Sequence, residues 1–60
     1  MSEMDLTVEI GRETDGRWIA EVVELPGVIT YGSTRAEAIL NARTLAAQVI
    51  ADRIEHGEWP

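Results

Sequence analysis

The side chains best suited to chemistry in this chain are acids, since it has eleven Asp and Glu, one histidine and no cysteine. Glu9 and Glu21 are predicted to be neighbours on adjacent strands, and paired carboxylates bind the metal ions of two-metal nucleases. A third carboxylate would have to converge with them, but Glu24 has the opposite strand parity to Glu21. We therefore predict no enzyme, no metal site and no cofactor.

Other polar residues have simpler structural explanations. Ser33 and Thr34 stand where a helix should begin, and helix capping accounts for both. His56 follows the predicted helix, where a charged imidazole suits the negative end of the helix dipole. The sequence also has no glycine-rich phosphate loop and no nucleophile elbow. None of these residues predicts catalysis.

Three short strands should hold the acids in place. Residues 6–10 alternate apolar and polar side chains, residues 17–23 form a second strand-like run, and residues 28–31 form a third. Asp15-Gly16 predicts a turn between the first two. Pro26 and Gly27 predict a type II turn before the third, because proline cannot continue a central strand and glycine accepts positive φ.

Burial should select the register of the first two strands. Pairing Ile10 with Ala20 gathers the apolar side chains on one face and sets Glu9 opposite Glu21 on the other. Like charges directly opposed in a sheet are unfavourable. The acidic face is either merely solvated or a docking surface for a basic partner, and the residues predicted for docking are Glu9, Glu21, Ile19 and Val23.

The segment 35–55 predicts one long helix, with Thr34 and Glu37 forming a capping box and Gly57 just past the end. Its apolar arc is about twice the ~100° that a helix needs to cover a sheet. A second copy of the chain is the simplest cover for the excess apolar surface. Alternatively, the alanines widen the arc through helix propensity alone, and the arginine stems simply lie on apolar surface. Trp59 could likewise fold back on its own domain. The predicted interface residues are Leu40, Arg43, Leu45, Ala47, Ile54 and Trp59.

Length and charge restrict the function further. Sixty residues form one small domain, residues 1–60, and a chain this short benefits from self-association. A net charge of -6 without lysine argues against nucleic-acid binding and fits either a basic partner or simple solubility. The acidic start lacks a signal-peptide pattern and no apolar run could span a membrane, so we expect a cytoplasmic protein.

Residues 15–42 resemble the core signature of the HicB-like family. The matching parts, in order, are an aromatic-led strand, a Leu-Pro-Gly turn, a Gly-x-Thr step into a helix and a Glu-Ala opening of that helix; here they are Trp18, Leu25-Pro26-Gly27, Gly32-Ser33-Thr34 and Glu37-Ala38. The structural motif residues are therefore Trp18, Pro26, Gly27, Gly32, Thr34 and Glu37. The resemblance implies a partial, degraded RNase H-like fold that commonly forms dimers or higher oligomers.

The fold class predicted is α+β: a three-stranded antiparallel β-meander followed by one long α-helix packed on one sheet face, with a vestigial fourth strand at the C-terminus as a variant. The resemblance implies an antitoxin that neutralises a small, basic, HicA-type mRNA-cleaving toxin by direct contact. The alternative is a stand-alone oligomeric structural or adaptor protein without a toxin. Residues 55–60 leave little room for the DNA-binding domain of longer antitoxins, so we do not expect DNA binding.

Overall fold

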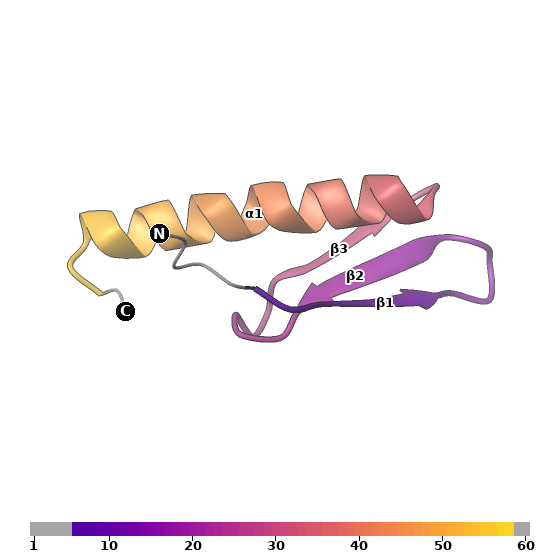
Figure 1. The fold of residues 1–60 in the computed structure, drawn as a ribbon, viewed down its shortest axis with the longest axis horizontal. Coiled ribbons are helices and arrows are strands. Elements are labelled where there is room, and N and C mark those ends of the chain that lie inside the picture. Colours follow the sequence, from indigo (N-terminus) through magenta and orange to yellow (C-terminus); the bar gives the residue numbers. More distant parts are fainter. Residues whose placement is uncertain (1–5, 59–60) are drawn as a thin grey trace.

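The computed structural model describes residues 6–58 and has the predicted β-β-β-α order (Figure 1). Strands β1 (Val8–Arg12), β2 (Trp18–Val22) and β3 (Ile29–Gly32) form an antiparallel sheet in the order β1-β2-β3, and helix α1 (Arg35–Glu55) follows. Figure 1 shows α1 across one face of the sheet and extending beyond it. The predicted fold class is confirmed. No helix within residues 6–58 combines the length and the apolar character needed to cross a bilayer.

The predicted register of the first hairpin is confirmed, while its bounds move. Ile10 pairs with Ala20, and Glu9 pairs with Glu21. The first strand ends at Arg12 instead of Ile10, because the loop is shorter than the polar run suggested. The Glu13 N–H donates to Arg17 O at 2.7 Å, and the Gly16 N–H donates to Glu13 O at 2.9 Å. This is a three-residue hairpin loop with glycine in the left-handed region.

Two consecutive turns join β2 to β3. Leu25 N donates to Val22 O at 3.1 Å, and Val28 N donates to Leu25 O at 3.0 Å. Gly27 has φ 94°, as the predicted type II turn requires. Leu25 lies where the two turns meet and is fully buried, so it belongs to the core rather than to the surface of the loop.

The core lies between the helix and the inner face of the sheet, and its fully or almost fully buried side chains are Ala20, Val22, Leu25, Val28, Ala38, Ala42, Ala46 and Ile50. Alanines at the helix contacts allow the helix and the sheet backbones to approach closely. The helix packs mainly on β3 and β2 and contacts β1 least. Leu6, Val8 and Ile10 are consequently only half-buried.

The helix begins and ends at the predicted residues, with one difference in the cap. Thr34 Oγ1 accepts the Glu37 N–H at 3.0 Å. The Glu37 carboxylate does not return to Thr34; it accepts the Ser33 N–H at 2.6 Å and the Ser33 hydroxyl at 2.9 Å. At the other end, Gly57 N donates to Ile54 O and Glu58 N donates to Arg53 O, the two bonds of a Schellman motif. No fourth strand follows α1 within the described chain.

Candidate partner-binding surface

The side of the sheet turned away from α1 carries the predicted docking residues. Because side chains alternate along a strand, Ala20 and Val22 point into the core, whereas Ile19, Glu21 and Val23 point outward. Glu21 pairs with Glu9 on one side and with Ile29 on the other. The outer sheet face is defined here by Glu9, Ile19, Glu21, Val23, Ile29 and Tyr31.

Two members of this face, Ile29 and Tyr31, are absent from the sequence prediction. The Thr30 hydroxyl donates to Ala38 O on α1 at 3.0 Å, so the residues on each side of it point away from the helix. The sequence contained the signal for both residues. Residues 28–31 are predicted as a short strand after the Pro26-Gly27 turn, and side chains alternate between the two faces of a strand. Applying the alternation to this strand, as to the first two, would have found both residues.

The apolar side chains of the outer sheet face are accessible to a partner. Val23, Ile29 and Tyr31 are between 42% and 46% exposed, and Ile19 is half-buried. Four apolar side chains beside an acidic pair resemble the mixed composition of protein interfaces, in which aromatic residues are enriched. The surface can therefore supply apolar contact area and negative charge together.

The acidic pair gives this face its electrostatic character. Glu9 and Glu21 are directly opposed across the β1–β2 ladder, and both are exposed. Carboxylates placed side by side on a sheet repel each other unless a cation lies between them. An arginine or lysine from a partner would relieve this repulsion.

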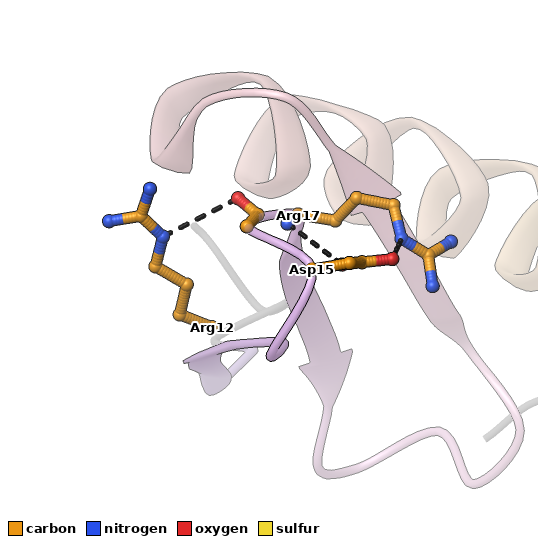
Figure 2. A network of polar contacts seen from close by, with 4 residues as sticks. Arg12, Asp15 and Arg17 are labelled. Carbon is orange, nitrogen blue, oxygen red and sulfur yellow. Dashed lines mark hydrogen bonds and ion pairs between the residues drawn. The ribbon is translucent and has the colours of Figure 1, made fainter.

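A polar network at the β1–β2 hairpin holds the side chains of Arg12 and Arg17 in place (Figure 2). Arg17 Nε lies 2.9 Å from Asp15 Oδ2, and the guanidinium stacks 4.6 Å from the centre of the Tyr31 ring. The Arg17 N–H donates to Asp15 and lowers the pKa of that carboxyl. Arg12 Nε donates to Gly16 O at 3.4 Å and stacks over Trp18. Arg12 is thus held within its own hairpin, and Arg17 is held by Asp15 and by Tyr31 of β3.

Glu24, the third carboxylate considered for a metal site, has a structural role. Its Oε1 accepts the Thr7 N–H at 2.7 Å, and this bond lowers the pKa of Glu24. Within residues 6–58, the three metal-type ligands that do converge are Asp52, Glu55 and His56, all exposed at the end of α1. His56 Nδ1 lies 2.8 Å from Asp52 O, so the ring is oriented by the helix end.

The predicted self-association residues divide into three groups. Leu40, Arg43, Ala47 and Ile54 are exposed on one side of α1, with Leu40 63% and Ile54 56% exposed. Leu45 is half-buried and packs against the core, so less of its side chain is available to a partner than that of Leu40. Trp59 lies outside the described residues. At 100° per residue the exposed four, together with Ala36 and Ala51, form one narrow stripe, named the helix stripe below.

The residues of the family-like motif build the junction between the sheet and the helix. Trp18 packs against the core, and Pro26-Gly27 forms the turn before β3. A Cβ added at Gly32 would lie 2.5 Å from Ala38 N, so only glycine allows β3 to pass this close to the first helical turn. Thr34 and Glu37 then cap the helix. The motif is therefore structural, and the candidate binding residues lie on the opposite side of the sheet.

Comparison with known proteins places this chain in a family. The UPF0150 protein Ta0767 of Thermoplasma acidophilum is 34% identical over 55 residues, which cover 92% of this chain and 80% of the relative. No family model matches the chain, and no solved structure matches it. An identity of this size over nearly the whole length shows common descent, and the chain belongs to the UPF0150 family.

Proposed function

We propose that this chain is a HicB-like, antitoxin-type binding module that acts in the cytoplasm. It would neutralise a small, basic, mRNA-cleaving toxin of HicA type by covering the toxin with its outer sheet face. The observation that carries the proposal is the pairing of Glu9 with Glu21 beside half-buried and exposed apolar side chains of the same face. The ordered motif from Trp18 to Ala38 supports the choice of partner through its resemblance to HicB-like proteins.

The charge of the chain favours this partner over others. The net charge of -6 attracts a basic protein and repels nucleic acid. Of the two hairpin arginines, Arg17 stacks on Tyr31 of the outer sheet face and pairs with Asp15. Arg12 stacks on Trp18, which lies on the helix side of the sheet. A basic toxin would therefore meet the Glu9–Glu21 pair on this face, and its positive charge is the proposed counterpart.

Binding to the product of a neighbouring reading frame tests the proposal. That product should be a short basic protein, and it should co-purify with this chain and lose its mRNA-cleaving activity. Glu21→Arg is expected to weaken the complex by roughly tenfold or more, equivalent to about 1.4 kcal/mol per tenfold. Glu55→Arg is the matched control, because it makes the same change of charge on the helix.

Two results would contradict this function. One is a neighbouring basic protein that fails to bind the wild-type chain. The other is an equal loss of affinity in Glu21→Arg and Glu55→Arg, since that would show attraction by net charge without a defined surface. Substituting Tyr31→Ala adds an independent measure, because an aromatic anchor at an interface often costs more than 1 kcal/mol when truncated.

A second candidate function is a stand-alone oligomeric structural or adaptor protein, and the helix stripe favours it. Leu40 and Ile54 are large apolar side chains left exposed along one line of α1. A second copy covering this stripe would bury both. Leu40→Glu should then reduce the oligomer in sedimentation experiments, whereas Gln48→Glu, on the polar side of the same helix, should not. An unchanged sedimentation coefficient in both variants would exclude the helix stripe as the interface.

A further inference from the structure

The two edges of the sheet are not equivalent. At β3, the carbonyl of Tyr31 accepts the Asn41 side-chain amide at 2.9 Å, so α1 occupies a hydrogen-bonding group of that edge. At β1, the Val23 N–H donates to Thr7 O, and the alternation of an antiparallel ladder then directs the N–H and C=O groups of Val8, Ile10 and Arg12 away from β2. Within residues 6–58, no strand lies on that side of β1.

The inner face of β1 is also incompletely covered. The helix packs mainly on β3 and β2, and Figure 1 shows α1 running above β3 with β1 on the far side of β2. Leu6, Val8 and Ile10 point toward the core but remain only half-buried. An open strand edge beside half-buried apolar side chains is a template for pairing with another strand.

We propose that β1 pairs with β1 of a second copy, antiparallel about a two-fold axis, to form a continuous six-stranded sheet. A second copy suits this edge because a two-fold axis brings identical hydrogen-bonding groups and identical apolar side chains together. The partner supplies the missing cover for Val8 and Ile10. The pairing requires no toxin, and its interface is distinct from both the outer sheet face and the helix stripe.

Charge and strand length select the register. An axis at Ile10 pairs all five residues of β1, with Ile10 opposite Ile10 of the second copy and Glu9 opposite Gly11 of the second copy. An axis at Glu9 would place the two Glu9 side chains opposite each other, each already opposed to Glu21 on its other side. Four carboxylates in one row are strongly unfavourable. The register centred on Ile10 avoids that row.

The geometry of this dimer enlarges the candidate binding surface. A two-fold axis perpendicular to the sheet keeps both helices on one side and both outer sheet faces on the other. The two Glu9–Glu21 pairs then flank the axis, and a basic partner meets a surface twice as wide. This consequence for a partner rests on the proposed function, whereas the dimer itself is measured with the isolated chain, so either can fail without the other.

Proline substitution tests the edge. The Ile10 N–H points away from β2, so Ile10→Pro removes a donor that the monomer's own ladder does not use and that the dimer requires. We expect the wild type to sediment as a dimer at micromolar concentration, and Ile10→Pro to remain folded by circular dichroism with at least 100-fold weaker dimerisation. Ile10→Val, which keeps the N–H, is the control and should remain dimeric. A monomeric wild type, or a dimeric Ile10→Pro, overturns the proposal.

Cysteine cross-linking measures the register even if the proline variant does not fold. The chain has no cysteine, so each single substitution reports one position. Residues opposed in a hydrogen-bonded antiparallel pair have Cα atoms about 5.5 Å apart, within disulfide range. Oxidised Ile10→Cys should give a covalent dimer, and adding Leu40→Glu should not reduce it. Thr44→Cys, on an exposed side of α1, should stay monomeric under denaturing electrophoresis. Equal cross-linking at both positions, or none at Ile10→Cys, overturns the proposed pairing.

Discussion

Gly32 lies so close to the first turn of α1 that a methyl group on it would sit 2.5 Å from the backbone nitrogen of Ala38. Backbone atoms cannot move aside as a flexible side chain can. The contact fixes the separation between β3 and the helix, and the hydrogen bonds from Thr30 to Ala38 O and from Asn41 to Tyr31 O depend on it. Gly32 is therefore required for close packing and not for a left-handed backbone conformation.

Gly32→Ala should lower the free energy of unfolding by on the order of 1–3 kcal/mol, because the added methyl group forces the helix away from the sheet. Urea unfolding followed by circular dichroism measures the loss. Gly11→Ala is the matched control on the same sheet: its new Cβ would meet only the Ile19 side chain, at 3.4 Å. Equal effects of the two substitutions would disprove the close-approach explanation.

Leu25→Ala should cost about 2–5 kcal/mol, since it leaves a cavity at a fully buried position. In a domain this small that loss is expected to unfold a large share of the molecules at room temperature. Leu40→Ala removes the same atoms from a side chain that is 63% exposed, so we expect less than about 1 kcal/mol on folding. Thermal unfolding of both variants separates core burial from general loss of apolar area.

Thr34→Ala should destabilise the domain by about 1 kcal/mol, because the Glu37 N–H loses its acceptor at the start of α1. Thr34→Ser keeps the hydroxyl and should retain most of the wild-type stability. The measurement is the urea midpoint of each variant. An alanine variant as stable as the serine variant would show that the cap contributes nothing.

Acid should weaken the fold through Glu24 and Glu37. The Thr7 N–H holds the pKa of Glu24 below its usual value of 4.5, and the Ser33 N–H does the same for Glu37. A carboxyl whose folded-state pKa is lowered stabilises the fold above the unfolded-state pKa, and this contribution disappears as the pH falls through the folded-state pKa.

The urea midpoint of the wild type should therefore fall between about pH 5 and about pH 3. Combining Glu24→Gln with Glu37→Gln should lower the midpoint near neutral pH and flatten its decrease in acid. Both carboxylates are exposed, so the effect is expected to be small. Parallel pH profiles for the wild type and the double variant would rule out this origin.

Local backbone and side-chain chemistry was enough to predict much of this fold. The Thr34 cap, the Pro26-Gly27 turn and the hairpin register follow from hydrogen bonding, φ preferences and burial on one face. The burial of Leu25 could not be predicted in this way, because a turn sequence does not reveal which side chain the tertiary fold draws inward. The role of Gly32 likewise depends on a contact with a segment whose position only packing determines.

The candidate surface was predicted in part. Glu9, Glu21, Ile19 and Val23 share the outer sheet face, as strand alternation implied. Leu45, predicted for an interface, is half-buried against the core, because the helix axis turns that side of the arc toward the sheet. Neither the open edge of β1 nor the bond from Asn41 to the β3 edge could be inferred from the sequence, since both depend on where α1 crosses the sheet.

The bond from Asn41 to the Tyr31 carbonyl also bears on solubility. A sheet with two open edges can add copies at both sides and grow into a fibre. Here α1 occupies one carbonyl of the β3 edge, whereas no described residue bonds the outward groups of β1, so β1 is the more open of the two edges. In the proposed dimer both β1 edges are used, so further growth would require the β3 edge. Asn41→Leu, which frees the Tyr31 carbonyl on that edge, should make the protein more prone to aggregate, as light scattering would detect.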